Sequence, residues 1–170
     1  KAELISVHGS AKIEGEISNA IKMNESVGGI VECRASNIPA GLGEPFFDSV
    51  ESVISHLVFA IPAVKGIEFG SGFGAAEMYG SQHNDLIMDE TGTTETNHAG
   101  GINGGITNGN ELVFRLAIKP TSSISKPQQT FNKQSGTREE LIVGGRHDVC
   151  VALRVPVIVE AVTAISLADL

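Results

Sequence analysis

The sequence predicts an α+β fold, in which antiparallel strands and helices share one core. Three observations support this prediction. Several short segments alternate apolar and polar residues, as half-buried strands do. Other segments have the apolar spacing or composition of helices. Strands and helices do not alternate strictly, which argues against a doubly wound parallel sheet. The chain has 170 residues, so we expect residues 1–170 to form one unit, either a single domain or a large part of one.

Alternation of apolar and polar side chains predicts four strands. They are AELISVHGS from Ala2, GGIVECRASN from Gly28, AVKGIEF from Ala63 and ELVFRLAIKP from Glu111. A fifth segment, QTFNKQSGTREELIVGG from Gln129, predicts a hairpin with its turn near Ser135 and Gly136. The polar segment of about residues 80–97 contains few large apolar groups after Met88, so we expect a flexible loop there.

Three segments are expected to be helical. Ile17–Glu25 has helical composition, and Val50, Ile54 and their neighbours recur at helical spacing in PFFDSVESVISHLVFAI. Asp48 is the expected N-cap of that second helix, with Glu51 completing a capping box, and Pro62 ends it. The segment Pro156–Leu170 is apolar nearly all round and is therefore expected in the interior. The chain begins in a strand and ends in this apolar segment, so both ends are expected to lie within a longer protein.

Composition excludes several classes of function. The net charge is −8, which argues against general nucleic-acid binding, since that requires a basic face. The last apolar run carries Arg154, Glu160 and Asp169, which argues against a membrane span. Cys33 and Cys150 are far apart and form no CxxC motif, so we expect two reduced, packed thiols in a cytoplasmic protein. No group of residues has the spacing of a metal site.

Three polar clusters interrupt the apolar segments. The first is the glycine-rich stretch TNHAGGINGGITNGN, residues 96–110, with His98 at its head. The second is Lys119–Ser123 at the end of the strongest strand, and the third is Arg146–Asp148 before the last helix. Together they predict the binding of an anionic, flat and phosphorylated ligand, although these patterns do not indicate a reaction.

Each cluster also has a purely structural interpretation. The glycine stretch fits a linker, a phosphate cradle or a backbone surface against a flat ligand, because glycine allows all three. It lacks the strand and helix context of a dinucleotide motif. Lys119–Ser123 offers hydroxyls and a cation for a phosphate, but composition alone favours a Ser/Thr turn after a strand. Arg146 could bind an anion or take part in a structural ion pair.

The same clusters carry a resemblance to the chorismate synthase family. GGRHDVCVALRVPVIVEAV, from Gly144 to Val162, is similar to the C-terminal signature of that family. NHAGGINGGITNG, KPTSSISKPQ, SVGGIVE, GLGEPFFDSVES and IPAVKGIEFGSGF also match, in the family's order, from about Ser26 to the end. The resemblance implies a β-α-β sandwich of antiparallel sheet packed on buried helices, and a homotetramer.

The resemblance also implies an activity and a set of site residues. Family members convert 5-enolpyruvylshikimate 3-phosphate to chorismate by an anti-1,4 elimination of phosphate. This lyase reaction is the last common step of the shikimate pathway for aromatic amino acids. It requires reduced FMN, with a link to NADP through flavin reduction. Flavin contacts are implied for Pro62, Ala63, His98, Gly104, Lys119, Pro120, Thr121, Ser122, Ser123 and Arg146. Arg146 and Asp148 are implied to hold substrate, and Asp148 to help relay a proton.

Two family motifs are absent from the sequence. The Gly-Glu-Ser-His-Gly stretch and an Arg-rich motif, which supply the catalytic histidines, do not occur, and His8 lacks the Glu-Ser that precedes the first. We therefore expect a C-terminal core fragment that folds but is inactive alone. Two other interpretations stay open: a non-catalytic module that binds flavin or phosphate, and a structural assembly core.

Overall fold

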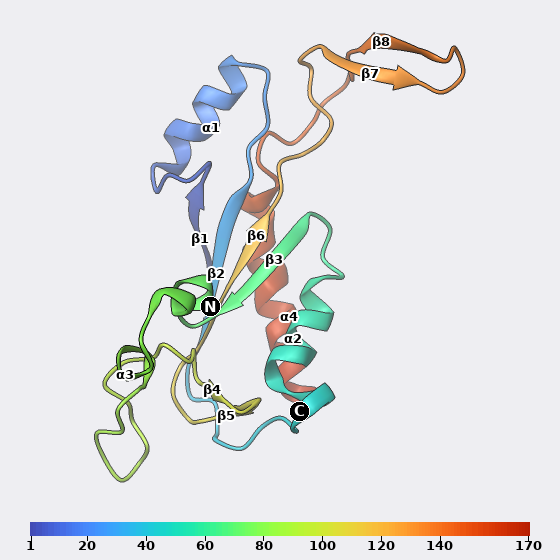
Figure 1. Ribbon diagram of the computed structural model, residues 1–170. Helices are drawn as coiled ribbons and strands as arrows, with labels where there is room; N and C mark the ends of the chain where they lie inside the picture. The colour runs from blue at the N-terminus through green and yellow to red at the C-terminus, as the bar shows by residue number, and fades with distance from the viewer.

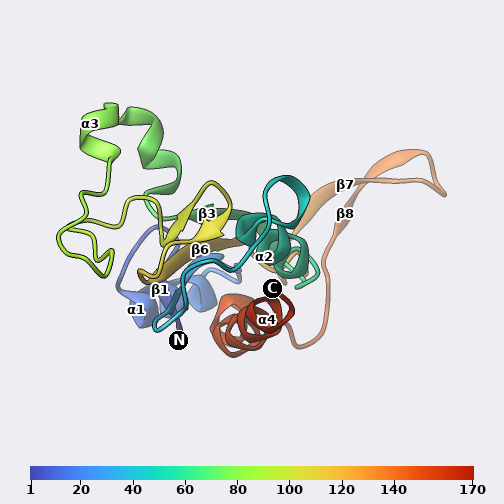
Figure 2. The ribbon, with the colours of Figure 1, turned by 90° about the horizontal axis from the view of Figure 1, so that it is seen from below.

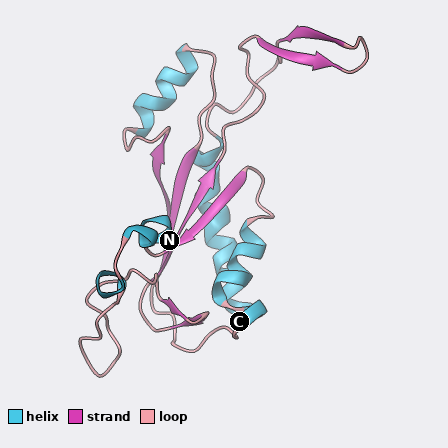
Figure 3. Ribbon diagram, in the orientation of Figure 1, coloured by secondary structure: helices cyan, strands magenta, loops and turns pink.

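The four strands expected from alternation form one antiparallel sheet in the order β1-β2-β6-β3 (Figure 1). The computed structural model describes all residues 1–170. The sheet strands are β1 (Ala2–Val7), β2 (Gly29–Ala35), β6 (Leu112–Ile118) and β3 (Val64–Phe69). The chain therefore has the mixed α+β architecture that the sequence predicts (Figure 3).

Two helices cover one face of this sheet, as Figure 2 shows from below. They are α2 (Val50–Val58) and α4 (Val155–Asp169), while α1 (Ile13–Lys22) packs beside β1. The core lies between sheet and helices and contains side chains with no exposed surface, such as Val31, Phe114, Ile54 and Val159. Burying each such side chain stabilises the fold by about 1.5–3 kcal/mol.

The remaining elements are short and lie at the two ends of the sheet. They are α3 (Gly80–His83), β4 (Ile102–Asn103), β5 (Ile106–Thr107), β7 (Gln128–Asn132) and β8 (Thr137–Leu141). Short 3₁₀ helices occupy Phe46–Asp48, Gly72–Glu77 and Val151–Arg154. The β7–β8 pair is the expected hairpin, and Gly136 in its turn has a φ of 73°. The prediction of that hairpin is confirmed.

The start of α2 differs from the expectation. Ser49, rather than Asp48, is the N-cap, and its hydroxyl accepts a hydrogen bond from Ser52 N at 3.1 Å. Asp48 instead belongs to the 3₁₀ turn that precedes the helix, where Phe46 has a φ of 70°. Serine and aspartate are comparable caps, so the turn and not the residue type decides between them.

Helix α4 is buried on one face only. Val155, Val159, Thr163 and Ser166 face the core, whereas Val157, Ile158 and Ile165 are between 42% and 68% exposed. The expectation of an interior helix is therefore met on only one face of α4 in this chain. Residues 151–169 are long and apolar enough to cross a bilayer by length and composition, a test that core helices of soluble proteins also pass. Its packing on β1 and β2 marks α4 as a core helix.

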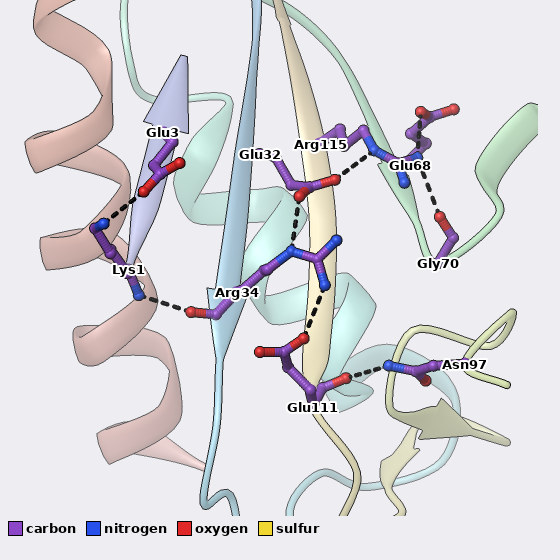
Figure 4. Close-up of polar contacts among 9 residues, drawn as sticks. All are labelled: Lys1, Glu3, Glu32, Arg34, Glu68, Gly70, Asn97, Glu111 and Arg115. Carbon is purple, nitrogen blue, oxygen red and sulfur yellow. Dashed lines mark hydrogen bonds and ion pairs between the residues drawn. The ribbon is translucent and has the colours of Figure 1, made fainter. Parts of the chain in front are cut away.

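The outer face of the sheet, opposite the helices, carries a row of ion pairs (Figure 4). Arg115 Nε donates to Glu32 at 2.8 Å, and Arg115 Nη1 donates to Glu68 at 3.1 Å. Arg34 pairs with Glu32 at 2.7 Å and with Glu111 at 2.8 Å. Partial burial would raise the pKa of Glu32, but its bonds with the two arginines hold that pKa below its usual range. This face is thus polar and internally compensated.

Both cysteines are buried and free, in agreement with the sequence prediction. Burial raises the pKa of each thiol. Cys33 Sγ lies 3.5 Å from Thr163 Oγ1 in the core. The two thiols are therefore protonated, packed groups with little reactivity.

Candidate functional site

Two of the three polar clusters gather at one end of the central sheet. Strand β6 runs antiparallel to β2 and β3, so the residues after β6 meet the residues before β2 and β3. Lys119 N donates to Ala63 O at 2.9 Å, and Ser26 Oγ donates to Thr121 O at 2.6 Å. Pro62 adjoins Ala63. This end of the sheet lies at the top of Figure 1.

The Arg146–Asp148 segment joins the same end. Val27 N donates to Val149 O at 2.8 Å, which fixes the segment beside the start of β2. A surface pocket of about 260 Å³ results. Its walls come from the end of α1, the loop after β6 and the loop after β8, with Asn24, Glu25, Ser26, Ser123, Ser125, Arg146, His147 and Asp148 among the lining residues. Sites that sequence reasoning treated separately thus share one pocket.

The charged groups of this pocket differ in their pairing. Asp148 Oδ1 accepts from Arg154 Nη2 at 2.8 Å, so Asp148 is held by an ion pair. His147 Nε2 lies 3.1 Å from the carbonyl oxygen of Gly144. Arg146 is exposed and has no hydrogen bond or ion pair. The guanidinium of Arg146 is therefore available for an anion.

Thr121 shows a deficit that a ligand would satisfy. Its Oγ1 is buried and has no hydrogen-bond partner, and it is the only buried side-chain N or O atom of the chain in that condition. A buried hydroxyl without a partner costs roughly 1–3 kcal/mol. Native proteins tolerate few such groups, and unpaired ones occur at functional sites. The observation favours ligand binding over a plain Ser/Thr turn at Lys119–Ser123.

Close backbone packing holds this loop in place. A Cβ at Gly28 would lie 2.3 Å from Ile118 O and 3.1 Å from Pro120 Cδ. Only glycine allows the start of β2 to approach the end of β6 so closely. Gly28, Ser26 and Arg154 were not among the predicted site residues, although they lie in SVGGIVE and GGRHDVCVALRVPVIVEAV, two of the segments that carry the family resemblance.

The first cluster lies at the opposite end of the sheet. His98 and Gly104 precede β6, whereas Lys119 follows it, and seven strand residues separate the two ends by roughly 20 Å. Gly104 sits in the turn between β4 and β5 with a φ of 59°, and a Cβ there would meet nothing within 4 Å. The structure therefore does not bring His98 and Gly104 together with the other predicted site residues.

Other glycines of the stretch pack against the protein itself. A Cβ at Gly100 would lie 2.5 Å from Gly70 N, and one at Gly101 would lie 2.6 Å from Glu111 O. Both have positive φ. Much of the glycine content is thus explained by backbone packing around the start of β6, without a ligand.

The segment expected to be flexible is tied to this end through Asp85. Its carboxylate accepts from His98 N at 2.7 Å, Ala99 N at 2.9 Å and Thr96 Oγ1 at 2.7 Å. Burial would raise the pKa of Asp85, but these bonds outweigh it and hold the pKa below its usual range. His98 Nδ1 also lies 2.7 Å from Ser71 Oγ. Flexibility of the segment stays a prediction.

The chain is an α+β protein with a free arginine, a lysine and an unpaired hydroxyl at one end of its sheet. These features define a class of protein that can bind phosphorylated ligands. Comparison with known proteins is more specific. The family model for chorismate synthase matches residues 2–170. The chain therefore belongs to the chorismate synthase family, and the match extends the resemblance to residues 2–25, beyond its expected start near Ser26.

Named relatives agree with this assignment. The chain is 62% identical over 169 residues to a chorismate synthase of Chitinophaga pinensis, covering 99% of this chain and 51% of the relative. It is 51% identical over 147 residues to one of Opitutus terrae, covering 85% and 40%. A crystal structure of chorismate synthase matches with a TM-score of 0.72 and 32% identity, over 92% of this chain and 40% of that one. The chain spans about half the length of the curated relatives it matches.

Proposed function

We propose that this chain forms the C-terminal core of a chorismate synthase, a lyase that converts 5-enolpyruvylshikimate 3-phosphate to chorismate with reduced FMN. One observation carries the proposal beyond family membership. The sequence-distant segments Pro62–Ala63, Lys119–Ser123 and Arg146–Asp148 meet at one end of the sheet. Unrelated structural roles would not require them to meet there.

The groups at this end suit a flavin phosphate or a substrate phosphate. Lys119 and Arg146 have no carboxylate partner, and the Thr121 hydroxyl has no hydrogen-bond partner. Lys119–Ser123 would hold FMN together with Pro62 and Ala63. When bound, reduced FMN supplies electron density as phosphate leaves the substrate. Arg146 supplies a positive charge already in place for the leaving phosphate, and such preorganised charge lowers the barrier.

Asp148 is the chain's candidate for handling a proton. Arg154 binds its Oδ1, which orients the carboxylate and leaves Oδ2 without a protein partner. An oriented carboxylate with one free oxygen can accept and return a proton at that atom. His98 and Gly104 remain proposed flavin contacts, but at a separate place in this chain, so we assign them no part in the pocket of Arg146.

The exposed face of α4 supports the proposal that the enzyme contains a further part. Val157, Ile158 and Ile165 form an apolar face on a helix that already covers one sheet. A second layer on this face would complete a β-α-β sandwich. We infer that residues 1–170 fold as the C-terminal core, that the intact enzyme is a cytoplasmic homotetramer, and that this piece alone does not turn over substrate.

The decisive experiment compares the intact gene product with its Asp148→Ala variant under anaerobic conditions with reduced FMN. We expect loss of chorismate formation by at least a hundredfold with flavin affinity within threefold of wild type. If the variant kept both chorismate formation and flavin affinity, the proposed role of Asp148 would be refuted. If the intact wild-type protein itself formed no chorismate but bound FMN, the alternative of a non-catalytic flavin-binding module would be correct. Absence of any flavin-induced rise in melting temperature would favour a structural assembly core.

A further inference from the structure

A long hairpin arm, residues 128–141, stands away from the rest of the molecule (Figures 1 and 2). It consists of β7, β8 and their turn, and its strand residues are exposed except for half-buried Asn132. The hydrogen bonds of residues 128–141 all join residues within the arm, and these residues form no ion pair. An isolated two-stranded hairpin is marginal in water, and three or more strands are needed for independent stability. The arm therefore lacks the support that its regular pairing requires.

The charges on β8 are also uncompensated. Arg138 and Glu140 are two residues apart and so lie on the same face of the strand. Their cross-strand neighbours on β7 are Phe131 and Gln129, which carry no charge. Neither Arg138 nor Glu140 has an ion pair in the structure. Phe131 on this same face is 59% exposed.

We propose that the free edge of β8 pairs with β8 of a second copy of this chain, forming a four-stranded antiparallel sheet across a two-fold axis. The axis passes through Glu139. In that register Arg138 of each copy lies directly opposite Glu140 of the other. A two-fold contact must be self-complementary, and a strand with opposite charges at positions i and i+2 satisfies this condition in antiparallel pairing. This pattern selects a second copy over an unrelated partner.

The alternative registers are less favourable. A two-fold axis perpendicular to the sheet keeps each side chain on its own face of the sheet. Moving the axis by one residue along β8 therefore shifts the partner of each residue by two positions. An axis at Arg138 places the two Arg138 side chains against each other, and an axis at Glu140 does the same with Glu140. With the axis at Glu139, the only like charges placed opposite each other are the two Glu139 carboxylates. Each of these already accepts hydrogen bonds from Asn132 and Thr137 within its own arm.

Pairing of the arms has a consequence for the pocket. The two segments that connect the arm to the body are the loops after β6 and after β8, and both line the pocket of Arg146. Fixing the arm therefore restricts the movement of Ser123 and Arg146 relative to each other. This consequence, unlike the pairing itself, rests on the proposed function, and it predicts tighter flavin binding in the paired state.

Charge exchange tests the pairing. Sedimentation equilibrium would measure the dimer dissociation constant of the 170-residue chain and of three variants. We expect R138E and E140R each to weaken dimerisation at least tenfold. Each substitution places like charges opposite each other in both of the 138–140 pairs across the axis. The double variant R138E/E140R should return to within threefold of wild type, because it restores opposite charges in the same register. Lys133→Glu, in the turn of the same arm, is the control and should have no effect.

Three results would overturn the proposal: a wild-type chain that stays monomeric at millimolar concentration, single variants that dimerise as wild type, or a double variant as weak as the singles. Far-ultraviolet circular dichroism and melting temperature would confirm that each variant folds, since the arm lies outside the core. Flavin binding is measured separately. Failure of flavin binding in a chain whose arms pair as described would count against the proposed function and leave the pairing intact.

Discussion

Removal of the unpaired hydroxyl of Thr121 is predicted to raise the stability of the free protein and to lower its affinity for flavin. Thr121→Val replaces the hydroxyl by a methyl group of similar shape. Because Thr121 Oγ1 is buried without a partner, the free protein loses an unfavourable group rather than a hydrogen bond. An unsatisfied buried hydroxyl costs roughly 1–3 kcal/mol, so we expect the variant to be about 1 kcal/mol more stable. For a chain of this size that corresponds to a rise of about 2–4 °C in Tm.

Thr163→Val is the matched control. Thr163 is also buried, but its Oγ1 donates to Val159 O at 2.7 Å. Removing a satisfied hydroxyl should cost about 1 kcal/mol. The two threonine variants are therefore expected to shift the urea midpoint of the chain in opposite directions, with unchanged slopes.

Flavin binding by the intact protein supplies the second half of the test. If the Thr121 hydroxyl binds the ligand, Thr121→Val should weaken the affinity for reduced FMN about tenfold, equivalent to about 1.4 kcal/mol. Anaerobic fluorescence titration measures this. The reasoning is refuted if Thr121→Val destabilises the chain as Thr163→Val does, or if it leaves flavin affinity unchanged.

Three further predictions concern packing and charge. Gly28→Ala places a Cβ 2.3 Å from a backbone oxygen and should cost at least about 2 kcal/mol, whereas Gly74→Ala, with nothing within 4 Å, should change the urea midpoint little. Asp85→Asn should cost about 1 kcal/mol at pH 7. Since the pKa of Asp85 is lowered on folding, its stabilisation is present above about pH 4 and is lost as the pH falls through the folded pKa. The free energy of unfolding, measured in urea from pH 7 to 3, should therefore decline less in the variant than in the wild type. An equal decline would contradict this. Arg115→Met should cost about 1–3 kcal/mol in the same assay, because it removes the only cation paired with Glu68 and one of the two paired with Glu32. An unchanged midpoint would show that the network adds nothing.

Strands were the most predictable part of this fold. ELVFRLAIKP alternates so clearly that β6 follows from its sequence, and β6 is the strand that pairs with both β2 and β3. Ser49 was not predicted as the cap of α2, because the 3₁₀ turn at Phe46 shifts the helix start by one residue. The one-sided burial of α4 was not predictable either, since an all-round apolar pattern does not say which parts of a protein cover it.

The polar clusters of the candidate site were recognised from the sequence, but their arrangement in space was not. Lys119–Ser123 and Arg146–Asp148 were each recognised as candidate anion sites, and hydrogen bonds from the start of β2 bring them together. Gly104 was assigned to the same ligand through the family resemblance. Strand β6, which lies between Gly104 and Lys119, is extended, however. Residues on its two sides are close in sequence but lie far apart in space. Sequence proximity is a poor guide when the intervening residues form a single strand.

The distribution of charge shows how an acidic chain can attract an anion. The chain carries a net charge of −8, yet the carboxylates near the pocket are each neutralised. Glu25 binds Lys126 at 2.6 Å, and Asp148 binds Arg154 at 2.8 Å. Lys119 and Arg146 then remain as unpaired cations at this end of the sheet. Close pairs largely cancel each other's field, so the local potential is set by the two free cations. The net charge of the chain is therefore compatible with a phosphate site, and the pairing of individual groups decides where that site lies.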